Sequence, residues 1–258
     1  MKSIAIIGFG RFGELLADLS RDSFTVNIVE SDSTKRDLAA GKNLTILEIQ
    51  DLPTVDYIFL AVPISAIEAL LKQIAPLVTN KQVVIDLCSV KTYPIRLMQQ
   101  YLPHAHVLGS HPMFGPDSAK KGLAGMQVAL CPVSVGDEDL KIIQGLWTKY
   151  GIVTAITTPE AHDRDTAYSQ AFTYSLAKLI LGVDIPDITF KTRSFNDIIE
   201  VATLSANDTD QLFHDMLFYN PYFTEMKEKL EKSMANTCAI LDVIANEQMH
   251  SEQVLIRQ

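Results

Sequence analysis

The sequence has few cysteines, no long hydrophobic run and no excess of positive charge. Its three cysteines, Cys88, Cys131 and Cys238, fit neither a disulfide framework nor a metal-binding C-x-x-C spacing. The longest apolar run, 57–64, is far shorter than the ~20 residues that a membrane span needs. A net charge of −9 disfavours binding to nucleic acid. These absences predict a cytoplasmic protein without a membrane span, a bound metal or a nucleic-acid partner.

The first part of the chain alternates short apolar runs with helical patterns. Such continuous apolar runs are typical of strands that are covered on both faces. The alternation predicts an α/β fold with a doubly wound, mostly parallel sheet, and a first domain over residues 1–157. The expected strands are 3–8, 25–30, 57–63, 82–87, 105–110, 127–132 and 152–157, and the expected helices are 12–20, 65–75, 92–101 and 137–149.

The pattern becomes helical from residue 158 onward. Thr158 is a candidate N-cap with Pro159 in the first helical position, and Gly182 can end that helix. Asp208 is expected to cap a later helix. Further helices are expected over 194–205, 208–218 and 222–248. We predict a helical domain over 158–258 that forms a homodimer, because its broad apolar helices need partners; the alternative is one domain with a helical tail.

A glycine motif follows the first expected strand and opens a helix. The spacing G-x-G-x-x-G in this context is typical of a Rossmann dinucleotide site. The first glycine permits a tight turn, the second allows close approach of a pyrophosphate, and the third lets helix and strand pack. The helix N-terminus adds free N–H groups. The predicted cofactor-binding loop consists of Gly8, Phe9, Gly10, Arg11, Phe12 and Gly13.

Glu30 ends the second expected strand, 17 residues beyond Gly13. A carboxylate there accepts both ribose hydroxyls of NAD and repels the 2′-phosphate of NADP, so NAD is the predicted cofactor. NADP is the alternative, because Ser31, Lys35 and Arg36 could bind that phosphate, and FAD fits less well. After the strand 57–63, Val62 and Pro63 could pack beside the cofactor, or Pro63 could simply end the strand.

Two polar segments follow later strands, where an open α/β sheet has its ligand crevice. In "GSHPMFGPDS", His111 is the predicted catalytic base, since its unperturbed pKa of ~6.5 suits proton transfer near neutrality and Pro112 restricts its backbone. In "DLCSVKT", Ser89 could hold His111 or a substrate hydroxyl, and Lys91 could attract an anionic substrate. Ser89 could instead cap the next helix. His162 could reach the crevice or lie in the domain joint.

Together, "GFGRFG", "DLCSVK", "SHPMFGPDS" and "EAHDRDTAYSQAF" resemble the prephenate and arogenate dehydrogenases of tyrosine biosynthesis. The resemblance implies a Rossmann domain, a helical dimerisation domain and oxidative decarboxylation of a cyclohexadienol. A hydride leaves C4 of the ring for the nicotinamide, the 4-hydroxyl loses its proton, and CO2 departs. By resemblance, His111 takes or hydrogen-bonds that proton, Ser89 assists, and Gln170 faces the substrate.

One position departs from the family pattern. Asn196 stands where many bacterial members carry a substrate-binding arginine, and Arg193 lies one helical turn away. The plant-type arogenate enzymes resemble this chain in lacking that arginine. Asp117 would attract the ammonium of arogenate and repel the pyruvyl carboxylate of prephenate, although bacterial prephenate enzymes can also be acidic here. The resemblance therefore leaves prephenate and arogenate both open as substrates.

Two alternatives compete with this hypothesis. One is another Rossmann reductase, such as a β-hydroxyacid dehydrogenase or a pyrroline-carboxylate reductase, but the "HPMFGP" segment argues against it. The other is a nucleotide-binding regulatory protein without turnover. The intact pair of Ser89 and His111 disfavours that reading, whereas Asn196 favours it.

Overall fold

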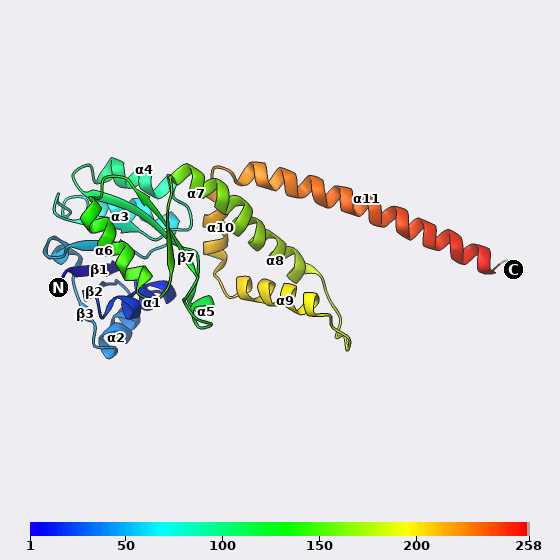
Figure 1. The fold of residues 1–258 in the computed structure, drawn as a ribbon, viewed down its shortest axis with the longest axis horizontal. Coiled ribbons are helices and arrows are strands. Elements are labelled where there is room, and N and C mark those ends of the chain that lie inside the picture. The colour runs from blue at the N-terminus through cyan, green and yellow to red at the C-terminus, as the bar shows by residue number, and fades with distance from the viewer. Residues whose placement is uncertain (257–258) are drawn as a thin grey trace.

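The N-terminal part of the chain folds into one eight-stranded sheet, at the left of Figure 1. In the computed structural model, which describes residues 1–256, the strand order is β3-β2-β1-β4-β5-β6-β7-β8. Neighbouring strands are parallel except β6 and β7, so the expected mostly parallel α/β fold is confirmed. The strands are β1 (Ser3–Ile7), β2 (Thr25–Val29), β3 (Thr45–Ile46), β4 (Tyr57–Leu60), β5 (Val83–Asp86), β6 (His106–Pro112), β7 (Gln127–Pro132) and β8 (Val153–Ile156).

Helices cover both faces of this sheet. Successive strand residues point to opposite faces, so Ile4 and Ile6 belong to one buried cluster while Ala5 and Ile7 belong to another. The first cluster includes side chains of α1 and α6, and the second includes side chains of α3 and α4. These helices and the shorter ones are α1 (Arg11–Ser20), α2 (Ser33–Gly41), α3 (Ile67–Ile74), α4 (Thr92–Tyr101), α5 (Pro116–Ala119) and α6 (Asp137–Thr148), with 3-10 turns at Ile49–Thr54 and Ile64–Ala66.

The strand order reverses between β1 and β4. β1 pairs with β2 on one side and with β4 on the other, and all three strands run in the same direction. The loops after β1 and β4 therefore separate to opposite faces and open a crevice at the carboxyl ends of the strands. The predicted nucleotide loop follows β1, so the fold places it at this switch point.

At one edge of the sheet, β3 and α2 were absent from the sequence prediction, and elsewhere the short helix α5 and the 3-10 turn at Ile49–Thr54 were absent as well. β3 contains only two residues, which is too short for a periodic signal. α2 buries only Ala39, so it lacks the apolar stripe by which an amphipathic helix is recognised. Both elements lie at the edge of the sheet beyond β2.

The C-terminal part is helical throughout its described length. α7 begins at the sheet, α8 and α9 form an antiparallel pair, α10 returns towards the sheet, and α11 extends far from the rest of the molecule (Figure 1). The helices are α7 (Pro159–Thr166), a π-helical turn at Ala167–Ala171, α8 (Phe172–Gly182), α9 (Arg193–Ala206), α10 (Asp210–Phe218) and α11 (Phe223–Ile256).

The caps of these helices agree with the sequence prediction at two of three positions. Thr158 caps α7, since its side chain accepts a hydrogen bond from Ala161 N at 3.2 Å, and α8 ends at Gly182. The expected cap at Asp208 is wrong: Thr209 caps α10 and accepts from Leu212 N at 3.1 Å. The Asp208 carboxylate instead accepts a hydrogen bond from the hydroxyl of Tyr174 on α8.

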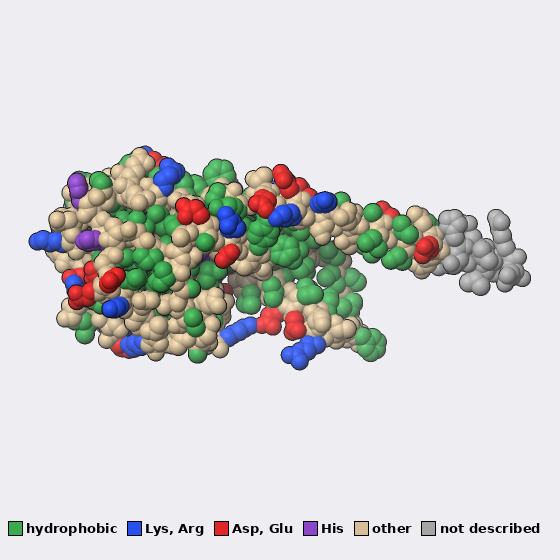
Figure 2. Space-filling view, turned by 45° about the horizontal axis from the view of Figure 1, so that its top comes forward, with side chains coloured by type: hydrophobic (Ala, Val, Ile, Leu, Met, Phe, Trp, Pro, Cys, Tyr) green, Lys and Arg blue, Asp and Glu red, His purple; other side chains and the backbone are tan. Residues whose placement is uncertain are grey.

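Large apolar side chains are exposed mainly on the helical part. Figure 2 shows them as green surface along the helices. No helix within residues 1–256 is both long enough and apolar enough to cross a membrane. The exposed apolar residues of this part include Leu179, Leu181, Val183, Ile185, Phe190, Ile198, Val201, Phe218, Met234, Ile240, Leu241, Val243 and Ile244.

Candidate active site

The loop after β1 has no space for a side chain at two of its glycines. Gly8 has a φ of 100°, and a Cβ atom there would lie 2.5 Å from the carbonyl oxygen of Ala61. A Cβ atom on Gly13 would overlap the carbonyl oxygen of Gly8. α1 begins at Arg11, so its unpaired N–H groups face the loop. The loop thus combines a tight turn with an open helix N-terminus, which is the arrangement that binds a pyrophosphate.

The carboxylate of Glu30 lies against this loop. It accepts hydrogen bonds from the backbone N–H groups of Phe9 at 2.7 Å, Ser31 at 2.8 Å and Asp32 at 3.0 Å. Burial acts to raise the pKa of Glu30, but the N–H groups of Asp32, Phe9 and Ser31 outweigh it, so the pKa lies below its usual value. Glu30 is therefore ionised near neutrality, at the end of β2, where a ribose carboxylate is expected.

Arg36, a basic residue near Glu30, is engaged by protein groups. Arg36 forms an ion pair with Glu48 at 2.6 Å and donates to the Glu30 carbonyl oxygen at 3.3 Å. After β4, a Val62 methyl carbon lies 3.2 Å from the position that a Cβ on Gly8 would take, so Val62 lies beside the glycine turn. Pro63 begins the 3-10 turn that follows.

The segment after β6 packs against the nucleotide loop. The rings of Phe12 and Phe114 have centroids 6.3 Å apart. Arg11 forms an ion pair with Asp117 and a longer one, at 3.7 Å, with Asp208. The hydrogen bond from Arg11 is the main reason that the pKa of Asp117 lies below its usual value. Asp117 is thus near the nucleotide loop, as a substrate contact would require, but its charge is already paired.

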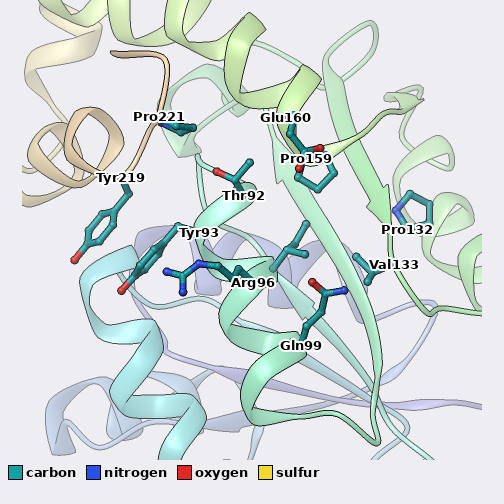
Figure 3. A pocket seen from close by; sticks show the side chains of 11 residues that line it. Thr92, Tyr93, Arg96, Gln99, Pro132, Val133, Pro159, Glu160, Tyr219 and Pro221 are labelled. Atoms are coloured by element: carbon teal, nitrogen blue, oxygen red, sulfur yellow. The ribbon is translucent and has the colours of Figure 1, made fainter. Parts of the chain in front are cut away.

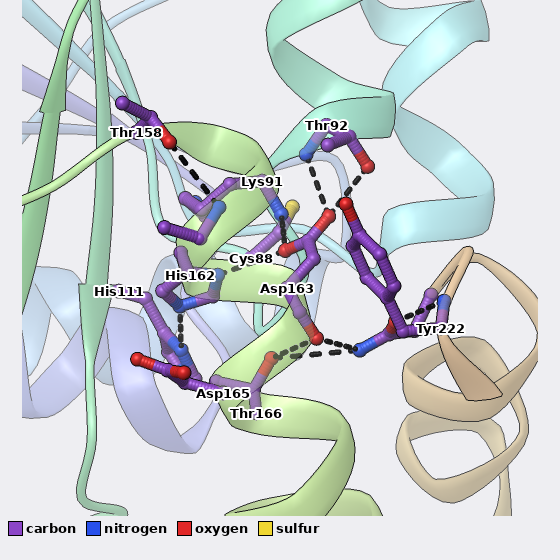
Figure 4. Close-up of polar contacts among 12 residues, drawn as sticks. Cys88, Lys91, Thr92, His111, Thr158, His162, Asp163, Asp165, Thr166 and Tyr222 are labelled. Atoms are coloured by element: carbon purple, nitrogen blue, oxygen red, sulfur yellow. Dashed lines mark hydrogen bonds and ion pairs between the residues drawn. The ribbon is translucent and has the colours of Figure 1, made fainter. Parts of the chain in front are cut away.

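His111 is buried at the end of β6 and joins a chain of three side chains (Figure 4). Its Nδ1 lies 2.9 Å from Nε2 of His162, and Nδ1 of His162 lies 2.8 Å from Oδ1 of Asp163. Burial lowers the pKa of His111 well below its usual value, and the nearby His162 and Lys91 add to this. His111 is therefore neutral at pH 7, as a general base must be.

His162 lies behind His111, in the joint between sheet and helices. It is 4% exposed and both of its ring nitrogens are engaged by protein groups. Of the two positions that the sequence allowed for His162, the structure has the domain joint. Its partner Asp163, 0% exposed, was not among the predicted residues. In the sequence, only its position directly after His162, about one helical turn beyond the N-cap Thr158, could have pointed to Asp163.

Lys91 was predicted to be accessible to an anionic substrate, but its side chain is buried. It is 0% exposed, forms an ion pair with Asp86 and donates to the carbonyl oxygen of Ser110 at 2.7 Å. The carboxylate of Asp86 neutralises the ammonium group inside the sheet region. Lys91 therefore ties the end of β5 to β6 and does not present its charge to a ligand.

Two predicted residues have buried polar atoms without a protein partner. The Ser89 hydroxyl and the Gln170 amide oxygen find no hydrogen-bond partner within residues 1–256. Buried polar atoms are rarely left unpaired, and in functional sites a bound ligand satisfies them. Ser89 does not hydrogen-bond His111 or cap α4 in the described part of the chain, so its hydroxyl is free for a ligand.

Arg193 lies apart from these residues. It is the first residue of α9, at the end of that helix far from the sheet (Figure 1). Its side chain is 95% exposed and its ion pair with Asp197 is long, at 4.0 Å. Within one chain, Arg193 therefore lies away from the residues around His111. Asn196 lies in the same first turn of α9.

A second hollow, of about 730 Å³, opens between α4, the end of β7 and the start of α7 (Figure 3). The rings of Tyr93 and Tyr219 lie 4.3 Å apart at its wall, and Arg96 lies 5.5 Å from the centre of the Tyr93 ring. It shares only Thr92 with the hydrogen-bonded chain around His111. Among residues 1–249, whose side chains the structure describes, no group of three or more His, Cys, Asp or Glu side chains could hold a metal ion.

The glycine turn at a switch point, the ionised Glu30 and the buried His111 define a class of protein. They are the parts of a dinucleotide-binding α/β protein, with a buried histidine on the strand whose following loop packs against the nucleotide loop through Phe114 and Phe12. Residues 17–156 match the family described as prephenate dehydrogenase, nucleotide-binding domain. The chain belongs to the prephenate dehydrogenase family.

Related proteins extend this comparison over most of the chain. Arogenate dehydrogenase 2, chloroplastic, of Arabidopsis thaliana is 26% identical over 239 residues, which are 88% of this chain and 66% of that protein. A probable arogenate/prephenate dehydrogenase of Methanocaldococcus jannaschii is 27% identical over 83% of this chain and 51% of its own length. The chain thus spans less than two thirds of these relatives. A structure of prephenate dehydrogenase from A. aeolicus, in complex with hydroxyphenyl propionate and NAD+, shares the fold with a TM-score of 0.75 at 19% identity, covering 100% of this chain and 97% of that one.

Proposed function

We propose that the protein oxidatively decarboxylates arogenate, prephenate or both, with NAD as hydride acceptor. The observation that supports this most directly is the buried, neutral His111 on the strand whose following loop packs against the nucleotide loop through Phe114 and Phe12. A base in that position can take a proton from a substrate while the cofactor lies on the substrate's other side. The relatives named as arogenate or prephenate dehydrogenases support the substrate class.

In this proposal the groups of the chain divide the reaction between them. NAD, when bound, accepts the hydride from C4 of the ring. His111 takes the proton of the 4-hydroxyl at Nε2, the ring nitrogen that does not face His162. In this proposal the Ser89 hydroxyl, which has no hydrogen-bond partner in the described side chains, hydrogen-bonds the same oxygen. As the carboxyl group leaves as CO2, the electron pair of the broken bond completes the aromatic ring, so the step is irreversible.

The choice of NAD over NADP rests on Glu30. An ionised carboxylate at the end of β2 accepts the ribose hydroxyls and repels a 2′-phosphate. Arg36, which could have bound such a phosphate, is paired with Glu48. The loop 8–13, with Val62 beside Gly8, would hold the pyrophosphate and the adjoining ribose.

We further propose that the chain divides into a nucleotide-binding domain over 1–157 and a helical domain from 158 onward, and that the helical domain forms a homodimer. The two large buried clusters belong to the first range, whereas the helical range has one small cluster and many exposed apolar side chains. Apolar faces of this extent are typical of protein–protein contacts. The three free cysteines, of which Cys238 is exposed, fit a reducing cytoplasmic setting.

The direct test is turnover. Purified protein is mixed with NAD or NADP and with arogenate or prephenate, and absorbance is followed near 340 nm. We expect NADH formation with at least one substrate and weaker activity with NADP. No reduction in any of the four mixtures would refute the proposed activity. The ratio of kcat/KM on the two substrates then decides between arogenate and prephenate.

A further inference from the structure

The contact between His111 and His162 connects the two parts of the chain. His111 belongs to β6 of the sheet, whereas His162 and Asp163 belong to α7, the first helix of the helical part. All three side chains are at most 4% exposed. Bulk water therefore does not compete for their hydrogen bonds. Each ring nitrogen that donates a hydrogen bond must face an acceptor on the neighbouring side chain, and each nitrogen with a lone pair must face a donor.

The protonation state of each ring follows from its neighbour. The pKa of Asp163 lies below its usual value: burial opposes this, but hydrogen bonds from His162, Thr92 and Lys91 outweigh it. An ionised carboxylate only accepts, so the His162 Nδ1 that lies 2.8 Å from it must carry a hydrogen. When His162 carries no second hydrogen, its Nε2 has the lone pair and accepts from Nδ1 of His111.

From this chain we infer that Asp163 and His162 are positioning residues, which hold neutral His111 as the tautomer with its lone pair on Nε2. The inference rests on the proposed function, in which Nε2 takes the substrate proton. When Nε2 is protonated, the Nδ1 hydrogen of His111 can move to Nε2 of His162, whose other hydrogen faces the carboxylate. The positive charge then lies next to Asp163 and His111 is neutral again.

Asp163 is fixed in place by the start of α4. Its carboxylate accepts hydrogen bonds from the backbone N–H groups of Lys91 at 2.7 Å and Thr92 at 2.9 Å, and from the Thr92 hydroxyl. These are unpaired N–H groups of a helix N-terminus, which favour an anion. Asn220 donates to the Asp163 carbonyl oxygen at 2.9 Å. The carboxylate is thus oriented before any substrate binds.

Other charged groups face the pair from the neighbouring elements. The ion pair of Lys91 and Asp86 lies at the end of β5; Asp86 interacts electrostatically with His162, and Lys91 with His111. Burial raises the pKa of the Cys88 thiol well above its usual value and that of Cys131 to about 12, so both thiols are neutral. Asp163 is the ionised group at the end of this chain: its carboxylate is hydrogen-bonded to His162, and His162 contacts His111.

Asp163→Asn gives the sharpest test, because an amide can donate where the carboxylate only accepts. The Asn side chain would donate to His162 Nδ1, His162 would then donate to His111, and the His111 hydrogen would move to Nε2. We expect the ¹⁵N NMR shifts of the His111 ring to exchange their assignments. We also expect kcat to fall by ~10³-fold with KM changed by less than about threefold, because ~10³-fold lies within the contribution of a positioned general base. Unchanged ring assignments in the folded variant would overturn the inference.

A second pair of variants covers the case in which Asp163→Asn does not fold. His162→Gln retains an amide donor for Asp163 and a carbonyl acceptor for His111, whereas His162→Leu retains neither. We expect the kcat of His162→Gln to be at least about tenfold higher than that of His162→Leu. A difference of this size is within the range of positioned proton-transfer groups. Equal kcat values in the two variants would contradict the inference.

Thr166→Val is the matched control. Thr166 is buried on the same helix, but its hydroxyl contacts the Asp163 carbonyl oxygen, at 3.3 Å, and not the carboxylate. Its kcat and its His111 ring assignments should match those of the wild type. The ring assignments need no turnover, so they distinguish this inference from the proposed activity. An inactive wild type with the expected tautomer would refute only the activity, and an active wild type with the other tautomer would refute only the inference.

Discussion

The sheet part and the helical part of this protein differ most in how they bury their apolar side chains. The sheet part has two large clusters, one on each face, and they include the fully buried Trp147, Tyr57 and Phe59. The cluster of the helical part contains three buried residues, Ala167, Ala171 and Met226. Phe190 and Phe218 in the helical part are 94% and 69% exposed.

This difference means that a single chain leaves more apolar surface exposed on its helical part than on its sheet part. Burial of apolar surface contributes roughly 25 cal/mol per Å² to stability. Covering the exposed apolar side chains of the helices would therefore stabilise the helical part further. A second copy that covers α8, α9 and α11 would supply this stabilisation. The joint between the two parts contains the pair of His111 and His162, so the chemistry depends on how they are held together.

The largest expected effect is that of His111→Asn. Asn at this position cannot act as a base, so turnover should fall by about 10³-fold while NAD affinity stays within about twofold. Steady-state kinetics and NAD titration by fluorescence measure the two quantities. The matched control is His106→Asn at the other end of β6, where the ring is exposed and bonds only the Ser134 carbonyl oxygen. Near-full activity of His111→Asn would show that another group is the base.

Ile244→Asp tests whether the helical part is completed by a second copy. Ile244 is 54% exposed in one chain and lies on α11. In a symmetric dimer the substitution occurs twice, and two lost apolar contacts of about 1.5 kcal/mol each weaken the dimer by roughly 100-fold. Light scattering after size exclusion measures the change. Leu38→Asp, an exposed site on α2, should leave the oligomeric state unchanged; a wild-type monomer at all concentrations would contradict the dimer.

Glu30→Ser tests whether the sheet part alone selects the cofactor. Without the carboxylate, repulsion of the 2′-phosphate disappears and the ribose loses an acceptor, so the ratio of NAD to NADP efficiency should fall by about tenfold. The kcat/KM values for both cofactors give this ratio. Asp37→Ser removes a carboxylate from the exposed face of α2 and serves as the control. An unchanged ratio in Glu30→Ser would mean that the carboxylate does not contact the ribose.

The smallest expected effect is on stability at low pH. The folded-state pKa of Asp163 lies below its usual value of 3.8, so its ionised form stabilises the protein above that pH. This contribution, about 1 kcal/mol, should be lost as the pH falls from about 4 through the folded-state pKa. Urea unfolding at pH 5 and pH 3 measures it. Between pH 5 and pH 3, the free energy of unfolding should fall less in Asp163→Asn than in the wild type. Equal losses in the two proteins would show that the Asp163 carboxylate does not contribute to the pH dependence of stability.

The sequence was most informative where local geometry and function coincide. Glycine spacing after an apolar strand predicted the turn at Gly8, and the "SHPMFGPDS" segment pointed to His111. It was least informative for long side chains. Lys91 was expected to contact a ligand. Its ammonium group is instead buried, because it forms an ion pair with Asp86, five residues earlier at the end of β5. Arg193 was expected near the substrate, yet the direction of α9 carries it away from the sheet.

The sequence alone determined the alternation of strands and helices, the position of the nucleotide loop and the change to a helical part at Thr158, because these depend on periodicity, glycine and capping over short distances. Only the tertiary structure decided that β7 runs antiparallel to β6 and that His162 and Asp163 lie behind His111. His111 and His162 are 51 residues apart, and their contact depends on the docking of α7 at the start of α4, which no local pattern encodes.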